Sequence, residues 1–398
     1  MKNRLLIFIS ILVQCQISWS QSPSSESMNS GESVISVFDK PVEFGGWKGE
    51  VITPGNLTEI KIGLFMPFDR NEPVAGPILK AAELAISEFN SSGGYYGVPF
   101  RLKTRWSYDP WRSGAREMIK LVYEDSVWAV IGSMDGTTTH IAQQIITKAW
   151  VPLLSPISAD PTLTYVRIPW IFRLPPDFEI QSSVICQQGI QRTSIKKVGL
   201  VTSVDHDGRT FAREMIQQLW KSEISPVFHF EIFPTKMDIT ELLQHLNSYD
   251  VEAMIWYLPP GYIKELMSRL AVCSSSTTII IPWIVGVNIE ELSELYPGTI
   301  FSLQPFSLIS DSGYSLFDEK YCRCYGIHPP AAAAYTYDAI QLLVLSMFKS
   351  GLNRSRLRDE LAGIGTFEGV TGKICWDNGG GNITEPLLNI LPGTPDQQ

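Results

Sequence analysis

The sequence has 398 residues, of which 44% are hydrophobic and 18% are charged, a globular composition with enough material for two domains of ordinary size. The formal net charge is −9, and it becomes about −11 once the two positive charges of the predicted signal peptide are removed. A surface that is acidic overall argues against a nucleic-acid partner.

The first 20 residues are predicted to form a secretory signal peptide. Lys2 and Arg4 give a basic start, residues 5–13 give an apolar core, and Ser18-Trp19-Ser20 gives a cleavage site with small residues at both ends. This core is about half as long as the roughly 20 residues that a membrane-spanning helix needs. No later segment is interpreted as a span, so the mature chain is expected to be soluble and periplasmic.

The six cysteines indicate little chemistry. Cys15 follows Leu12-Val13-Gln14, half of a lipid-attachment motif, but Gln14 is larger than the residue that usually precedes the cysteine. A lipid anchor at Cys15 is therefore the less favoured alternative. The other five cysteines allow disulfides in an exported chain, and their odd count leaves at least one thiol over. No cluster of cysteine and histidine has the spacing of a zinc site, so no metal is expected.

A segment rich in Ser, Gly, Pro and Glu at 21–57 is predicted to be a tether or loosely packed arm. Strands and helices then alternate, and most of the strands are continuous apolar runs, as in sheets buried on both faces. This alternation predicts a parallel sheet flanked by helices. The predicted strands are 60–66, 100–106, 127–131, 151–155 and 170–173, and the predicted helices are 76–90, 111–124 and 138–149.

A second series of the same kind follows Leu174-Pro175-Pro176, where two prolines end the preceding element. Two α/β units of similar size, joined by short crossings, predict two lobes with a cleft between them. The predicted helices of this series are 179–191, 210–220, 239–246 and 262–273, and its predicted strands are 197–203, 227–233, 252–258 and 278–285. Further helices at 314–325 and 331–350 and a last strand at 372–376 are predicted after it.

The loops at the carboxyl ends of the strands hold the candidate site, because open parallel sheets bind ligands there. In the first unit, Asp135, Gly136 and Thr137 lie between a strand and a helix. Asp135 is interpreted as the helix cap, and the free backbone N–H groups beside Gly136 suit an anion such as a carboxylate. The next loop again presents small and hydroxyl residues, and the two loops together favour a small polar ligand. Its candidate residues are Ile157, Ser158 and Ala159.

In the second unit, Asp205 and Asp207 follow a strand and either pair with a ligand ammonium or cap the next helix. His206, between them, is interpreted as a solvated loop residue. Trp283 ends an Ile-rich strand and either stacks on a ligand or is buried in the core. The stretch Tyr257-Leu258-Pro259-Pro260 lacks the glycines that commonly let a ligand approach the backbone.

Catalysis finds little support in the sequence. It has no GxSxG, no HExxH and no P-loop, and Gly93-Gly94 with Gly97 is interpreted as a helix stop. An enzyme is therefore not expected, and neither a cofactor nor a metal is predicted.

The ordered set of motifs resembles the type I periplasmic binding proteins, specifically the Leu/Ile/Val-type amino-acid-binding proteins of ABC importers. The resemblance runs from about residue 60 to about residue 391, and no single piece is specific. Its pieces are Ile60 to Pro67, Gly76 to Asn90 with Ser92 to Gly97, Tyr108-Asp109-Pro110, Ala129 to Gly132, Ser155 to Thr164, Ile171-Phe172-Arg173 with Asp177, Ala333-Ala334-Tyr335 with Asp338-Ala339, and Gly369 to Gly372 with Trp376-Asp377.

The resemblance implies an α/β Venus flytrap, two lobes that each hold a parallel sheet flanked by helices, joined by three crossings. It implies a first lobe of residues 58–175 with 306–372, a second lobe of 176–305 with 373–391, and a tail at 392–398. In the family, the loops at Gly136-Thr137 and at Ile157 to Ala159 hold the ligand's carboxylate. An aromatic residue beside a glycine is usual where this chain has Asp205 to Gly208, and an acid is usual where it has Trp283 to Val285. These departures favour an aromatic or less cationic ligand, such as an amide, an aromatic acid or a small metabolite.

The expected function is that of an extracytoplasmic solute-binding protein, which captures a small polar ligand for the permease of an ABC importer. The ligand classes that the resemblance leaves open are amino acids, amides and small carboxylates. A ligand sensor of the same fold, which passes lobe closure to a receptor or regulator, is the alternative. The ectodomain of a eukaryotic receptor is a further, less favoured possibility.

Overall fold

The computed structural model describes residues 57–233, 243, 248–272, 277–307 and 312–392. Five predictions fall wholly or largely outside these residues. They are the signal peptide at 1–20, the lipid anchor at Cys15, the arm at 21–57, the helix at 239–246 and the tail at 392–398.

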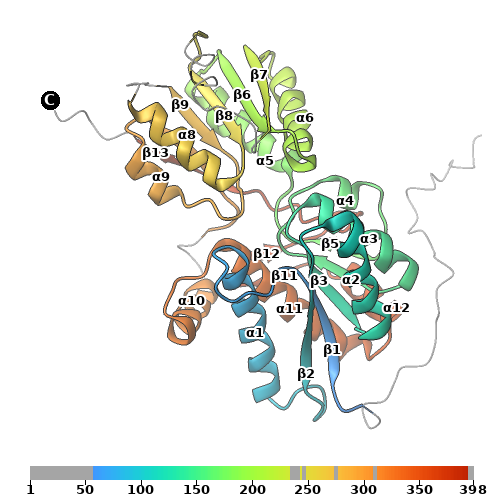
Figure 1. Ribbon diagram of the computed structural model, residues 1–398. Helices are drawn as coiled ribbons and strands as arrows, with labels where there is room; N and C mark the ends of the chain where they lie inside the picture. The colour runs from blue at the N-terminus through green and yellow to red at the C-terminus, as the bar shows by residue number, and fades with distance from the viewer. Residues whose placement is uncertain (1–56, 234–242, 244–247, 273–276, 308–311, 393–398) are drawn as a thin grey trace, which may run out of the picture. The chain divides into compact units, whose positions relative to one another are not determined.

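The first lobe is built on a parallel sheet of five strands in the order β2-β1-β3-β4-β5. The predicted strands are all present, although β3 and β4 begin two residues later than expected. Figure 1 shows α1 to α4 arranged around this sheet. The strands are β1 (Ile60–Phe65), β2 (Phe100–Arg105), β3 (Ala129–Gly132), β4 (Leu153–Ser155) and β5 (Ile171–Arg173). The helical elements are α1 (Ala75–Ser91), η2 (Pro110–Gly114), α2 (Ala115–Ile119), η3 (Lys120–Glu124), α3 (Gly136–Ala149) and α4 (Thr162–Tyr165).

The second lobe holds a six-stranded sheet in the order β13-β10-β9-β8-β6-β7. It is parallel except for β13, which pairs antiparallel with β10, and neither of these two strands was predicted. The strands are β6 (Val198–Ser203), β7 (Phe228–Ile232), β8 (Ala253–Tyr257), β9 (Thr278–Ile281), β10 (Ile300–Gln304) and β13 (Leu387–Leu391). The helical elements are α5 (Phe178–Val184), η4 (Ile185–Gln191), α6 (His206–Lys221), α8 (Pro260–Val272) and α9 (Ile289–Leu295).

Two element boundaries differ from the prediction in ways that affect the site. The helix expected at 210–220 begins at His206, so Asp205 is its N-cap and Asp207 lies in its first turn. The strand expected at 278–285 ends at Ile281 because Pro282 follows, and Trp283 therefore lies in the loop beyond the strand.

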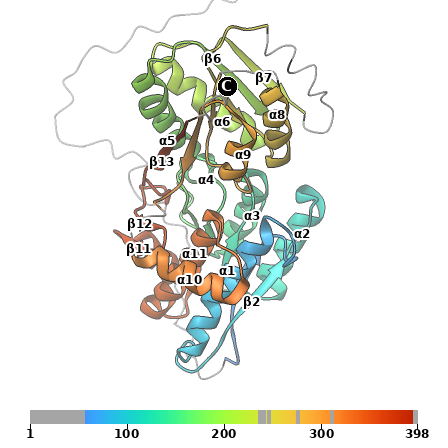
Figure 2. The ribbon, with the colours of Figure 1, turned by 90° about the vertical axis from the view of Figure 1, so that its left-hand side faces the viewer.

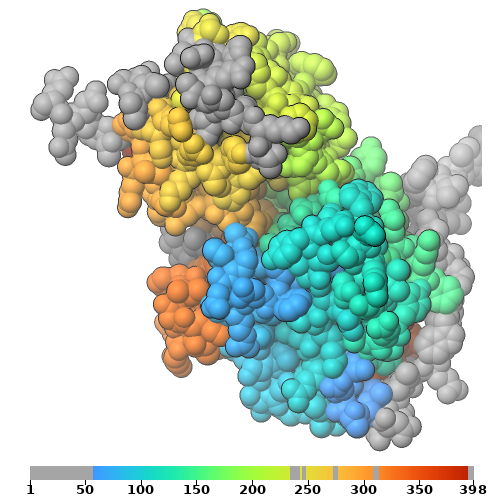
Figure 3. All heavy atoms as spheres, viewed as in Figure 1, coloured from blue at the N-terminus to red at the C-terminus, as the bar shows by residue number. Residues whose placement is uncertain are grey.

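The chain returns to the first lobe after β10. Here α10 (Ser312–Tyr325), α11 (Ala331–Ser350) and α12 (Arg354–Ala362) precede a hairpin of β11 (Phe367–Gly369) and β12 (Gly372–Ile374). Side chains of α1 and α11 belong to one buried apolar cluster, and Figure 2 shows the two helices side by side. In Figure 3 the residues from β1 to α4, coloured blue to teal, form one continuous surface of this lobe.

One helix in the described part of the chain, α11, is long and apolar enough to cross a membrane by length and composition. Its burial points to a different role, because 78% of its apolar window is buried inside the protein. Ala333, Ala339, Leu343 and Met347 are among its fully buried residues. This is the pattern of a core helix.

Arg173, at the end of β5, joins two of the three crossings between the lobes. Its guanidinium Nη2 lies 2.7 Å from Asp177 Oδ2 at the start of α5, and its Nη1 donates to Pro175 O at 2.6 Å. Its backbone N–H donates to Gly380 O, and Asn382 N donates to Arg173 O. The chain therefore still contacts β5 at residues 380–382. The segment that was expected to enter the second lobe at residue 373 first pairs with β5 and then forms β13.

The four described cysteines, Cys186, Cys322, Cys324 and Cys375, are free thiols. Cys273 lies outside the described residues. No disulfide joins the described cysteines, so the fold of this part of the chain rests on its buried apolar clusters.

Candidate functional site

A cavity of about 270 Å³ lies at the carboxyl ends of the strands and is lined by loops of both lobes. Eight of the nine predicted site residues line it, and the ninth, Gly136, contacts a lining residue. The structure therefore brings the predicted residues of the two lobes together. The eight are Asp135, Thr137, Ile157, Ser158, Ala159, Asp205, Asp207 and Trp283.

The turn from β3 into α3 sets the first wall of the cavity. Gly132 ends the strand with a φ of +145°, and a Cβ there would lie 2.5 Å from Phe65 O, so glycine is required. Asp135 then caps α3, because its Oδ1 accepts from Thr138 N at 2.7 Å, with the Thr138 hydroxyl completing a capping box. The predicted cap is confirmed.

Gly136 and Asp207 connect the lobes directly. The Gly136 N–H, at the first turn of α3, donates to Asp207 Oδ1 and Oδ2 of α6 at 3.0 and 3.1 Å. A Cβ on Gly136 would overlap Asp207 Oδ1 and would lie 2.7 Å from Asp160 Oδ2 and 2.8 Å from the His206 ring. The helix N-terminus predicted to hold a ligand anion thus holds a carboxylate of the protein itself.

Acidic side chains dominate the charge of this cavity. Burial, reinforced by the charge of Asp135, raises the pKa of Asp207 to about 7 despite the hydrogen bond from Gly136. Asp205 caps α6 by accepting from Gly208 N at 2.8 Å and still lines the cavity. A cationic group entering the cavity would therefore relieve the repulsion between neighbouring carboxylates.

His206 is not the solvated loop residue that was predicted. It is the first residue of α6, and its Nε2 lies 2.6 Å from Asp160 Oδ2 of the first lobe. That hydrogen bond raises the pKa of His206. Burial would raise the pKa of the Asp160 carboxyl, but hydrogen bonds from His140, His206 and Thr162 outweigh it and hold this pKa well below its usual range.

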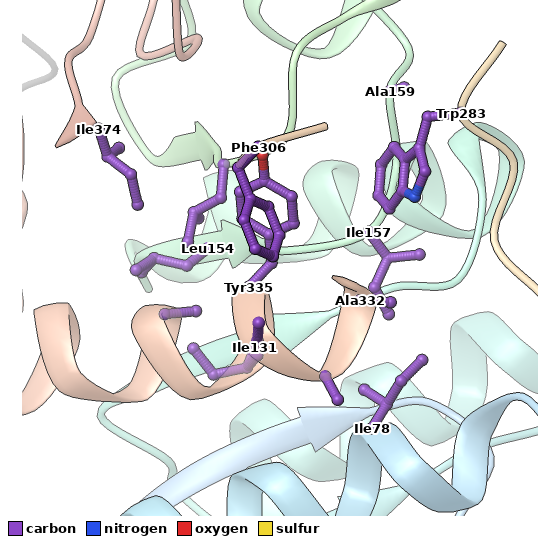
Figure 4. Packing of buried hydrophobic residues seen from close by; sticks show 14 of the residues in the cluster. Ile78, Ile131, Leu154, Ile157, Ala159, Trp283, Phe306, Ala332, Tyr335 and Ile374 are labelled. Atoms are coloured by element: carbon purple, nitrogen blue, oxygen red, sulfur yellow. The ribbon is translucent and has the colours of Figure 1, made fainter. Parts of the chain in front are cut away.

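Apolar side chains form the rest of the cavity wall. Trp283 is 9% exposed and belongs to the core, as one of the two predicted roles requires, and it also lines the cavity. Figure 4 shows its ring beside Ile157 and Ala159. Tyr257 and the loop residues after it, Leu258 and Pro259, also line the cavity.

A second, larger cavity of about 650 Å³ lies at the other end of the first sheet. Glu59 and Lys61 of the β1 end, Trp128 before β3, and Arg354 line it. None of the predicted site residues is among its lining. Because ligands of open α/β sheets bind at the carboxyl ends of the strands, we assign the candidate site to the smaller cavity.

The sequence profile of the family described as "Periplasmic binding protein" matches residues 59–388. The chain belongs to this family. The two sheets, the flanking helices and the three crossings are thus those of a two-lobed type I periplasmic binding protein. Members of this family are binding proteins and not enzymes, and membership implies an extracytoplasmic location.

Known proteins of this type resemble the chain over most of its length. An amino acid binding protein of Pseudomonas aeruginosa is 21% identical over 335 residues, which cover 81% of this chain and 87% of the relative. The fold matches LivJ of Streptococcus pneumoniae, a branched-chain amino acid transporter substrate binding protein in complex with isoleucine. The TM-score is 0.74 at 22% identity, over 84% of this chain and 96% of that one. A Rhodopseudomonas palustris solute binding protein in complex with benzoate has a TM-score of 0.71 at 16% identity, over 83% of this chain and 92% of that one.

Proposed function

We propose that this protein captures a small polar solute in the 270 Å³ cavity and delivers it to the permease of an ABC importer. The observation that supports the proposal most strongly is that residues of both lobes line this one cavity at the strand ends. Ligand capture by lobe closure needs no reacting groups, which fits a family of binding proteins. The volume of the cavity suits a small molecule.

The charges around the cavity favour a ligand with an amino or amide group. Asp135, Asp205 and Asp207 line the cavity, and no lysine or arginine appears among its described lining residues. Asp207 already accepts from the Gly136 N–H, so a ligand carboxylate at that point would have to displace it. An ammonium or amide donor would instead bind Asp205 or Asp207 by a charge-assisted hydrogen bond.

The apolar wall favours a ligand with a hydrocarbon or aromatic part. The Trp283 ring is held 5.8 Å from the Tyr335 ring, and its backbone N–H donates to Gln181 Oε1 at 3.0 Å. Its position is therefore fixed before a ligand enters. The complexes of the two structural relatives, with isoleucine and with benzoate, also contain ligands that combine an apolar part with a polar head.

A thermal-shift screen of matched ligands tests this proposal. The panel pairs leucine with leucinamide and isoamylamine, and benzoate with benzamide and benzylamine. We expect a ligand with an amino or amide group to raise Tm by several degrees, because saturation at about 100 times Kd adds roughly 2.7 kcal/mol of stability. Shifts with benzoate alone would contradict the proposed head group, and no shift with any small solute would contradict solute capture.

Replacing Asp207 by Asn tests the head group separately. Asp207→Asn keeps the shape and an oxygen acceptor for Gly136 N but removes the charge that would bind an ammonium. We expect at least tenfold weaker binding of the amine by calorimetry, since a hydrogen bond to a charged group contributes about 1.5–3 kcal/mol. Asp250→Asn, an exposed acid of the same lobe paired with Lys197, is the matched control and should bind as the wild type does. Equal affinities of the two variants would contradict the role of Asp207.

A further inference from the structure

Two histidines and one aspartate converge between the lobes, next to the ligand cavity. His140 of α3 and His206 of α6 place their Nε2 atoms 3.0 and 2.6 Å from the same oxygen, Asp160 Oδ2. One ligand-type atom from each of the three residues lies within 4.8 Å of the others. The aspartate is fully buried, whereas both imidazoles are partly exposed, so the group can be reached from solvent.

The hydrogen bonds around His140 determine which nitrogen carries the proton in its neutral form. Gln143 Nε2 donates to Leu163 O at 2.9 Å, which leaves Gln143 Oε1 facing His140 Nδ1 at 3.0 Å. Because a carbonyl oxygen only accepts, His140 Nδ1 must carry the hydrogen. The lone pair of a neutral His140 therefore lies on Nε2 and points toward Asp160.

In the neutral ring that lone pair meets no hydrogen-bond donor, and the hydrogen bond from His140 to Asp160 forms only when Nε2 also carries a hydrogen. The Asp160 carboxylate only accepts, and the Thr162 hydroxyl, 2.8 Å from His140 Nε2, already donates to Asp160 Oδ1 at 2.7 Å. A positive centre at this point would satisfy the His140 nitrogen and the Asp160 oxygen at once. Either a proton on the imidazole or a bound cation can provide it.

We propose that His140, Asp160 and His206 bind a divalent transition-metal ion, with zinc the best match, in a site that joins the two lobes. Two imidazoles and one carboxylate with an open fourth position are a common zinc set, whereas Mg²⁺ and Ca²⁺ prefer oxygen ligands. Gln143 orients His140 from the far side of its ring, as outer partners of metal-binding histidines do.

The geometry and the charge around the site both suit a cation. Ligand atoms of a tetrahedral zinc site are about 3.3 Å apart for bonds of about 2.0–2.1 Å, so the 3.0 Å contact of His140 with Asp160 needs to open by about 0.3 Å and the 2.6 Å contact of His206 by about 0.7 Å. The carboxylates of Asp160 and Asp207 both lie next to Gly136, so two acidic side chains face this point. Because the ligands come from both lobes, the metal would stabilise the arrangement in which the ligand cavity is complete.

The test is a calorimetric titration of Zn²⁺ into the chelator-stripped protein, without any solute ligand. Asp318, Cys322 and His328 form a second group of possible metal ligands among the described residues, so the parent for all variants is Cys322→Ser. We expect one Zn²⁺ per chain in this parent and at least tenfold weaker binding after either His140→Ala or His206→Ala. His229→Ala, a histidine of β7 that contacts Thr202, is the control and should bind zinc as the parent does.

Cobalt gives an independent readout, because Co²⁺ in a tetrahedral site has strong visible absorption that should be present in the parent and absent in both histidine variants. Zinc binding that is lost in the Cys322→Ser parent, or that both histidine variants retain unchanged, would overturn the proposal. Because the titration contains no solute, its failure leaves the proposed solute capture untouched. A failed ligand screen likewise leaves the metal site untouched.

Discussion

Gly136→Ala is expected to weaken binding of the solute by about 100-fold while the protein stays folded. The added Cβ would overlap Asp207 and crowd Asp160 and His206 at the contact between the lobes. Overpacking of this kind costs about 1–3 kcal/mol, and the hydrogen bonds from the Gly136 N–H to a carboxylate would weaken as well. About 3 kcal/mol corresponds to about 100-fold in Kd.

The same substitution should leave each lobe intact, because Gly136 is a helical residue without a positive φ. The free energy of unfolding without ligand should fall by no more than about 1–3 kcal/mol, because only the crowding against Asp160 lies within one lobe. Gly261→Ala, in the first turn of α8, is the matched control, since a Cβ there would meet no atom within 4 Å. Calorimetric Kd values that are equal for the two variants would show that ligand binding does not use the contact at Gly136.

Asp177→Ala is expected to lower the free energy of unfolding by about 4 kcal/mol. The Arg173 guanidinium is 1% exposed, and Asp177 provides its only carboxylate partner among the described residues, at 2.7 Å. Removing one partner of a buried ion pair costs about 3–5 kcal/mol because the other charge stays buried and unpaired. The variant also loses the cap of α5, where Asp177 Oδ1 accepts from Ile180 N.

Urea denaturation measures this effect directly. Glu265→Ala is the control, because its partner Arg269 lies on the same helix and both side chains are about half exposed. Such a surface pair contributes less than about 1 kcal/mol. A similar small loss for both variants would mean that Pro175 O and the chain at Gly380 hold Arg173 in place without Asp177.

The strand ends carried most of the information in the sequence about the candidate site. Apolar runs that stop at small, hydroxyl or acidic residues located the loops at Asp135, Ile157 and Asp205 without any structure. This worked because the carboxyl ends of parallel strands meet at one edge of a sheet. Pro282 was the overlooked signal for the end of β9, because proline cannot donate a hydrogen bond to a neighbouring strand.

The contacts between lobes could not be predicted from the sequence. Asp160 and His206 are 46 positions apart, and no local pattern reports that α6 brings its first turn against the loop after β4. Gly136 and Asp207 are separated even further, by 71 positions. For this reason His206 was assigned to solvent, and the proposed metal ligands could not be recognised in the sequence.

The edge strand β13 of the second sheet was missed for a different reason. Leu387–Leu391 pairs with the sheet on one side only, and most of its residues are exposed, so its sequence lacks the continuous apolar run of a central strand. The segment before it, up to Asn382, bonds to Arg173, a contact that depends on tertiary structure alone.

A crystal structure with the amine or amide that gives the largest thermal shift would test the central claim most directly. The account predicts the ligand in the cavity between Trp283 and the loop of Ile157 to Ala159, with its amino or amide nitrogen on Asp205 or Asp207. Ligand density in the larger cavity beside Trp128 and Arg354, with the smaller one empty, would contradict it.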